Sequence, residues 1–336
     1  MLTARPVPGG VAAESSDVAV SPAQATLRFD QTVDRSLVHR HAIAEVFVTD
    51  ATAGPDDRTF VAVQIPRGHR VNRDSERVAD VLILEALRQA SIYVAHTVLS
   101  VPQDMVFVFN GMALRFTDPS GLRFCGNQLS SIIDLAARTD HLPNGRPTKM
   151  QFTARLLVDG LIAVEADSEV SLVTRKAWSI LCVRAGMDVS GIVEEGHAPR
   201  NIIGPIAEIV QDVRSDGRRE CRAQIIVDER HPFYFDHPLD HIPAALQVDA
   251  IGELCAELLA TGTSERQRPV LRSITMAFQG FAGLSSPAFA AVRLEEEAEH
   301  YGDPTSCTVI GEIRQGKSTT TVATLVYTDG EGCAND

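Results

Sequence analysis

The chain has 336 residues, 44% hydrophobic and 22% charged, and this length favours two globular domains over one. Its net charge of −13 argues against a general nucleic-acid-binding protein, because phosphate contacts require clustered lysine and arginine. No apolar run approaches the roughly 20 residues of a membrane span, and the N-terminus lacks the apolar stretch of a secretory signal. The six cysteines form no CxxC pair, so we expect reduced thiols in a soluble, cytoplasmic protein.

In chain order, residues 1–27 are rich in Pro, Gly, Ala and Ser and are predicted to be a flexible arm. A first repeat is expected over residues 28–180, with an insertion at about 116–147 that contains a short helical stretch, LSSIIDLAAR. A long apolar run predicts a helix over Val78–Leu99. Alternating apolar residues predict strands at Ile43–Thr49, Thr59–Ile65, Asp104–Arg115, Lys149–Val158 and Leu161–Thr174.

A second repeat is expected over residues 181–328, followed by a flexible tail over 329–336. Its helix is predicted at Pro243–Ala260. Its strands are predicted near Ile206–Asp212, Glu220–Asp228, Val270–Phe281, Ala288–Glu296, Ser306–Arg314 and Thr319–Tyr327.

Three short matches in the same order, at nearly one offset, show that the chain is a duplication. AEVFVTD at Ala44 matches AEIVQD at Ala207, PRGH ending at His69 matches DERH ending at His231, and LEA matches VDA. In each copy a buried helix is followed by antiparallel strands, which predicts an α+β fold with a sheet wrapped around a central helix.

The first helix carries three polar residues on one face. Glu85, Arg88 and Gln89 are spaced i, i+3 and i+4 within the otherwise apolar run VLILEALRQASIYVAH. A buried, unpaired charge is costly, so these groups either pair with each other, as on a solvated helix face, or line a cavity.

The segment HPFYFDHPLDHIP, which precedes the second helix, concentrates histidine and aspartate in a loop fixed by proline. It contains His231, Asp236, His237, Asp240 and His241. Rigid loops are common positions for catalytic and binding groups, so the cluster as a whole indicates a site.

These motifs resemble those of a known family. His231, the proline-rich spacing and the Asp249-Ala250 pair resemble the signature of hotdog 3-hydroxyacyl-ACP dehydratases. The HPFYFDHPLDHIP string, together with VHR, AEVFVTD, PRGH and LEALRQA upstream, more specifically resembles the A-factor synthase (AfsA) family, over about residues 36–328. The resemblance implies two tandem hotdog repeats.

The resemblance also implies an activity. It is the transfer of a 3-ketoacyl group from acyl carrier protein to a hydroxyl of dihydroxyacetone phosphate, towards a γ-butyrolactone signal or a related butenolide or furan. No cofactor is expected. This chain departs from the family in its second helix, where Asp249, Gly252 and Glu253 replace the usual Glu, Arg and Gln.

If the duplication mimics a hotdog dimer, Glu85 should face His231, and Asp249 should face His69. We therefore expect Glu85, His231 and Asp249 to be catalytic, with acid–base chemistry and direct transfer, because no Ser or Cys lies in a nucleophile motif. Backbone N–H groups at the start of a central helix are expected to bind the thioester oxygen. The expected substrate-binding residues are Arg88, Gln89, His69, Asp236, His237, Asp240, His241, Arg67 and Arg70.

Two of these residues belong to a basic loop, made of Arg67, His69, Arg70, Arg73 and Arg77. It is expected to meet a phosphate or the acidic carrier protein, or else to be a solvated surface. The alternative functions are dehydration or hydrolysis of acyl thioesters by the same groups, and a non-catalytic ligand-binding protein whose second site has decayed.

The same histidine and aspartate loop leads to a prediction about metals. His237-x3-His241 resembles a pair of metal ligands, but proline breaks the loop, so the two side chains do not share a helix face. We expect elemental analysis of the dialysed protein to find no stoichiometric transition metal. A retained metal that is lost in a His237→Ala, His241→Ala variant would contradict this.

Overall fold

The computed structural model describes residues 24–74, 76–184, 204–213, 219–260, 269–295 and 306–328. Nearly all of the predicted arm and the whole predicted tail lie outside these ranges. Within them, no helix is long and apolar enough to cross a bilayer.

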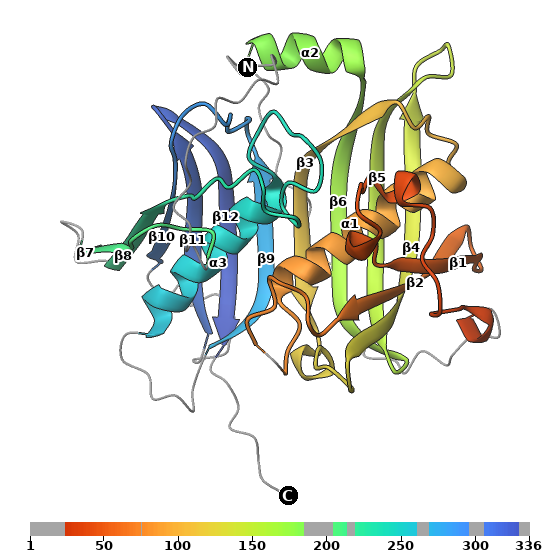
Figure 1. The fold of residues 1–336 in the computed structure, drawn as a ribbon, viewed down its shortest axis with the longest axis horizontal. Helices are drawn as coiled ribbons and strands as arrows, with labels where there is room; N and C mark the ends of the chain where they lie inside the picture. The colour runs from red at the N-terminus through yellow and green to blue at the C-terminus, as the bar shows by residue number, and fades with distance from the viewer. Residues whose placement is uncertain are drawn as a thin grey trace, which may run out of the picture.

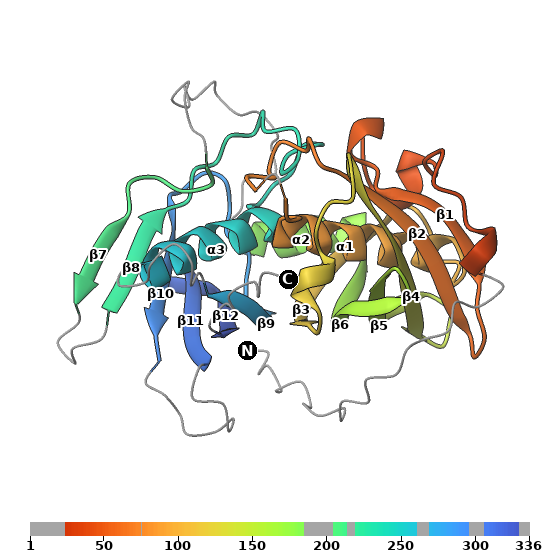
Figure 2. The ribbon, with the colours of Figure 1, turned by 90° about the horizontal axis from the view of Figure 1, so that it is seen from below.

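The fold is one 12-stranded antiparallel sheet that carries two central helices on the same face (Figure 1). The helices are α1 (Asp80–Thr97) and α3 (Ala244–Ala260), close to their predicted bounds. Both begin near the centre of the molecule and run outward in opposite directions. The sheet curves around them, as the view from below shows (Figure 2).

Each half of the chain contributes six strands. The first half supplies β1 (Val48–Ala53), β2 (Arg58–Pro66), β3 (Met105–Phe116), β4 (Gln128–His141), β5 (Pro147–Val158) and β6 (Leu161–Thr174). The second supplies β7 (Val210–Val213), β8 (Arg219–Gln224), β9 (Val270–Phe278), β10 (Ala288–Leu294), β11 (Ser306–Gln315) and β12 (Ser318–Thr328).

The strand order confirms the duplication. It runs β1-β2-β4-β5-β6-β3-β9-β12-β11-β10-β8-β7, so the second half repeats the first in mirror order. The two halves join where β3 pairs with β9, over Gly111–Arg115 and Ser273–Ala277. The predicted α+β architecture, with a central helix and an antiparallel sheet in each repeat, is confirmed.

Alternation along the strands explains why the helices sit on one face. In β6, buried and mainly apolar residues alternate with partly exposed Glu165, Asp167 and Glu169, so only one side of the strand can pack against a helix. Helix α1 is buried almost all round and packs on that side. Apolar residues of both halves form one continuous core.

Two predictions about local structure were wrong, and one helix was not predicted. The stretch LSSIIDLAAR is not helical: it lies in β4, which pairs with β2 and β5 and has β10 as its counterpart in the second half. Residues Ile43–Glu45 form a short 3-10 helix, η3, and the first strand begins only at Val48. A helix that the sequence pattern missed, α2 (Arg175–Arg184), follows β6 and spans the predicted boundary at residue 180.

The junction between the two halves leads to a stability prediction. A Cβ added at Gly111 in β3 would lie 2.9 Å from the carbonyl oxygen of Met276 in β9. Because backbone cannot move aside as a flexible side chain can, we expect Gly111→Ala to lower the free energy of unfolding by about 1–3 kcal/mol.

Urea denaturation measures this effect, and a second Gly→Ala substitution serves as its control. Gly252 lies inside α3 with nothing within 4 Å of an added Cβ. Gly252→Ala should therefore stabilise the protein by about 1 kcal/mol through helix propensity. Equal effects of the two substitutions would contradict the close approach at the β3–β9 junction.

Candidate active site

A buried ion cluster on α1 lies at the centre of the candidate site. Glu85, whose side chain is 2% exposed, accepts hydrogen bonds from Arg40 Nε at 2.9 Å, Arg88 Nε at 2.8 Å and Gln89 Nε2 at 2.7 Å. The i, i+3, i+4 spacing brings Arg88 and Gln89 to it, as expected, whereas Arg40 comes from the segment before β1. The carboxylate is thus paired rather than free.

The pairing determines the protonation state of Glu85. Burial alone would raise the pKa of this carboxyl, but the charges of Arg40 and Arg88 and their hydrogen bonds outweigh it and lower the pKa to about 2. Glu85 therefore remains ionised at neutral pH and is a weak proton acceptor. The geometry favours a role in holding the two guanidinium groups.

Arg40 also joins the two halves of the chain. Its Nη1 donates to the carbonyl oxygen of Phe233 at 2.8 Å, and its guanidinium lies 5.3 Å from the centre of the Phe233 ring. Gln89 donates to the carbonyl oxygen of Glu45 at 2.7 Å and accepts from the Phe47 N–H at 2.8 Å. The cluster thereby fixes the segment before β1 and the loop before α3.

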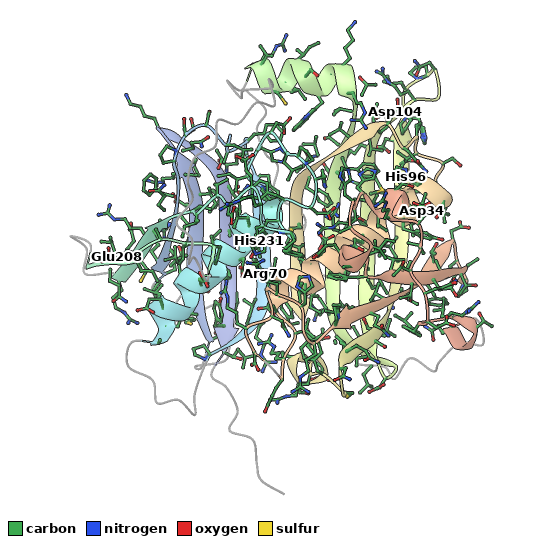
Figure 3. All side chains as sticks on the ribbon, in the orientation of Figure 1. Asp34, Arg70, His96, Asp104, Glu208 and His231 are labelled. Atoms are coloured by element: carbon green, nitrogen blue, oxygen red, sulfur yellow. The ribbon has the colours of Figure 1, made fainter. Side chains whose placement is uncertain are left out.

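The two histidines matched by the duplication, His69 and His231, lie near each other. His69 Nε2 is 3.1 Å from a Glu45 carboxylate oxygen in a buried pair. His231 accepts from the N–H groups of Phe233 and Tyr234, and burial, followed by the charge of Arg70, lowers its pKa. His231 and Arg70 both lie near the centre of the molecule (Figure 3). Among the described residues, no hydrogen bond or ion pair joins the predicted pairs Glu85–His231 and Asp249–His69.

The carboxylate of the second helix forms a different cluster. Asp249 accepts from the Tyr234 hydroxyl and from Arg73 at 3.0 Å, and Arg73 also pairs with Glu253. Burial raises the pKa of Asp249 and that of Glu253, the latter to about 7. Gly252 stands where the first helix has Arg88, and Arg73 from the first half supplies the guanidinium group that pairs with Asp249.

Two aspartates of the loop before α3 are structural anchors. Asp236 accepts from the N–H groups of His41 and Ala42, the second at 2.9 Å. Asp240 accepts from Trp178 Nε1 at 2.8 Å, Cys182 Sγ at 3.3 Å and His241 Nδ1 at 2.7 Å, and despite burial these bonds lower its pKa to about 2. The first aspartate holds the segment before β1, and the second holds α2.

A cavity of about 1390 Å³ opens between these segments. Of the predicted site residues, Glu85, Arg88, His237, Asp240 and His241 line it. Seven others do not: Gln89, His69, His231, Asp236, Asp249, Arg67 and Arg70. Polar lining residues that were not predicted include Arg35, His39, Arg40, His41, Arg175, Trp178 and the acidic Glu229. The VHR string, which contains His39 and Arg40, was the available signal for two of them.

His237 is placed to accept a proton in this cavity. Its Nδ1 is buried without a hydrogen-bond partner, 3.7 Å from the Asp236 carboxylate, which leaves Nε2 as the nitrogen that a substrate can reach. The nearby carboxylate favours the tautomer with hydrogen on Nδ1 and the lone pair on Nε2. Burial and the charges of Arg88 and Arg40 lower the pKa of His237, so the ring is neutral at pH 7.

His39 also lines the cavity, and its tautomer is fixed by a hydrogen bond to His96. His96 Nδ1 lies 2.8 Å from the Val101 carbonyl oxygen and must donate to it, so His96 Nε2 accepts from His39 Nε2 at 2.9 Å. Burial, followed by the charge of Arg88, lowers the pKa of His39 to about 3. His39 is therefore neutral and has its lone pair on Nδ1.

The basic loop is mostly used for internal contacts. Arg67 donates to the Gly126 carbonyl oxygen, Arg73 pairs with Asp249 and Glu253, and Arg77 pairs with Asp80. Its remaining arginine, Arg70, is exposed. The described residues contain no cluster of three or more His, Cys, Asp or Glu side chains suited to a metal ion.

The ion cluster leads to a prediction about stability and pH. Removing the charge of Glu85 leaves buried Arg40 without its counter-ion, so Glu85→Gln should cost about 3–5 kcal/mol of stability at pH 7. Because the folded pKa of about 2 lies below the ordinary value of 4.5, this contribution is complete above pH 4.5 and is lost as the pH falls towards 2.

Unfolding free energies of wild type and variant, measured between pH 7 and pH 3, test this. The control is Glu76→Gln, which removes an exposed pair with Arg123 and should change stability by less than about 0.5 kcal/mol. A difference between wild type and Glu85→Gln that stays constant down to pH 3 would contradict the depressed pKa.

This chain is similar in sequence to one curated protein and in fold to several solved structures. A curated protein of Streptomyces virginiae, 2-oxo-3-(phosphooxy)propyl 3-oxoalkanoate synthase, is 24% identical over 262 residues, which cover 77% of this chain and 86% of that protein. Among solved structures, a tesB protein of Mycobacterium avium subs paratuberculosis has a TM-score of 0.48 at 13% identity, covering 84% of this chain and 96% of that chain. The 12:0-ACP thioesterase from Umbellularia californica has a TM-score of 0.47 at 11% identity, covering 81% and 98%.

The family comparison is the decisive one. The A-factor biosynthesis hotdog domain (AfsA) matches residues 22–174 and again residues 207–328, which together make up most of the chain. The two matched segments contain the two central helices and both copies of the sheet. The chain therefore belongs to the AfsA family of A-factor biosynthesis hotdog proteins.

Proposed function

We propose that this protein is an acyltransferase that moves a 3-ketoacyl group from acyl carrier protein to a hydroxyl of dihydroxyacetone phosphate. The observation that carries the proposal is the cavity between the two halves, where cationic side chains, a neutral histidine and a helix start meet. The Streptomyces virginiae relative is named for a phosphorylated ketoacyl ester of this kind.

The phosphate of the acceptor is assigned to the cationic wall of the cavity. Arg88, Arg35 and Arg175 line it, and a guanidinium N–H donates a strong, charge-assisted hydrogen bond to a phosphate oxygen. The Glu85 carboxylate accepts two hydrogen bonds of 2.8 Å from Arg88 and so fixes the position of its guanidinium group. The carboxylate predicted as a base thus acts in this proposal as the positioning group for a phosphate site.

The proton is assigned to His237. Its Nε2 accepts the proton of the acceptor hydroxyl, the hydroxyl oxygen attacks the thioester carbon, and a C–O bond forms. When the C–S bond breaks, the imidazolium returns the proton to the leaving thiolate. The products are the ester and free carrier thiol, and no covalent acyl-enzyme is required.

The oxyanion is assigned to the start of α3. Ala244 and Ala245 lie in its first turn and line the cavity. First-turn N–H groups have no partner within their own helix, and their dipoles point at a developing negative charge. The sequence predicted that the start of a central helix binds the thioester oxygen, and this proposal assigns that role to the second helix.

The test is incubation with a 3-ketoacyl carrier thioester, with and without dihydroxyacetone phosphate. We expect an ester only when the acceptor is present. Free acid in both samples would identify a thioesterase, an enoyl product from a 3-hydroxyacyl thioester a dehydratase, and no product with any thioester a ligand-binding protein.

The proton carrier is tested by His237→Gln, which keeps a polar side chain but removes the base. We expect kcat to fall by about 10²–10⁴-fold, as for the loss of a general base. The matched control is His141→Gln at the exposed end of β4, which should leave kcat unchanged. Full activity of His237→Gln would overturn the assignment.

A further inference from the structure

We propose that the outer face of α2 is the docking surface for the acidic carrier protein that delivers the acyl thioester. The inference rests on the proposed function and names the place where its partner binds. The sequence had suggested the basic loop at Arg67–Arg77 as the surface that meets the carrier protein. Most arginines of that loop bind partners within the chain, so we assign the role to α2.

The first observation is the composition of α2, RKAWSILCVR. Its charged residues are Arg175, Lys176 and Arg184, and it contains no acidic residue. Within the described residues, none of these three forms an ion pair. In a chain with a net charge of −13, a cationic helix of this kind is a local exception. Charge complementarity therefore favours an acidic partner.

The second observation is that the apolar residues of α2 face outward. Ile180 is 47% exposed and Val183 is 65% exposed, which is unusual for large aliphatic side chains in a helix. Lys176, Ile180 and Arg184 are spaced i, i+4 and i+8, so they form one stripe with Val183 beside it. The stripe presents an apolar centre between two cations, the arrangement of a polar-rimmed interface.

The third observation is that the opposite face of α2 is anchored to the cavity. Trp178 and Cys182, also four residues apart, both donate to Asp240. The Trp178 ring packs against Phe281 with centroids 4.9 Å apart, and Trp178 and Arg175 both line the cavity. Figure 1 shows α2 at one end of the sheet, apart from the two central helices. A carrier bound on α2 therefore sits beside the cavity.

The test variant is Lys176→Glu, Arg184→Glu, assayed with two forms of the same thioester. One is carried by the protein, and the other by free pantetheine, which needs no docking surface. We expect KM for the carrier-bound thioester to rise about tenfold or more, while kcat/KM for the pantetheine thioester stays within about twofold. The salt dependence of KM should weaken in the variant, because the charges that steer association are reversed.

The control variant makes the same change in net charge elsewhere. Arg146 and Lys317 are exposed in the turns between β4 and β5 and between β11 and β12, so Arg146→Glu, Lys317→Glu should leave both KM values unchanged. A second variant, Ile180→Ser, Val183→Ser, should raise the carrier KM but retain its salt dependence. An unchanged carrier KM, or equal losses with carrier and pantetheine thioesters, would overturn the proposal.

Binding of the acylated carrier, followed by fluorescence anisotropy without turnover, separates this proposal from the proposed function. If no ester forms in any assay but the wild type binds the carrier and the charge-reversed variant does not, the docking surface stands and the reaction assignment falls. If ester forms from both thioesters and binding is equal in wild type and variant, the reaction stands and the docking surface falls.

Discussion

The buried carboxylate of Glu85 is the interaction on which the arrangement of the site depends. Transferring such a charge out of water costs several kcal/mol, and only nearby cations and donors offset that cost. The protein meets this demand with Arg88 and Gln89 from the same helix and with Arg40 from a distant segment. Arg40 also donates to the carbonyl oxygen of Phe233. The residue that neutralises Glu85 therefore holds together two walls of the cavity, one from each half of the chain.

The fold followed from the sequence where a pattern was long or repeated. The two central helices were predicted to within two residues at each end, because their apolar runs are long and their copies confirm each other. Strand β4 was misread because its short apolar run, LSSIIDLAAR, fits either period, and its pairing with β2 and β5 decides the outcome. Helix α2 was missed because Cys182 is its only buried residue, so its apolar residues do not follow the pattern of a helix packed on the core.

The site was predictable only in part. Glu85 and Arg88 were found together because helix geometry alone makes them neighbours. Arg40 lies 45 residues from its partner, and that contact is set by how a loop packs, which no local pattern encodes. The expectation that Glu85 faces His231 assumed the pairing of a symmetric dimer, and it stays a prediction. In this structure His231 Nδ1 accepts from the backbone of its own loop.

The tandem arrangement changes how such a site can be inherited. In a dimer of identical subunits, every substitution occurs at both symmetry-related positions. The two sites of such a dimer therefore cannot acquire different residues. Joining β3 to β9 within one chain removes that constraint. Arg88 could be kept while its counterpart became Gly252, with Arg73 supplied from the opposite half. Two sites that are equal in a symmetric dimer can thus take different roles, and in the proposed mechanism one helix contributes a charged cluster and the other its N-terminus.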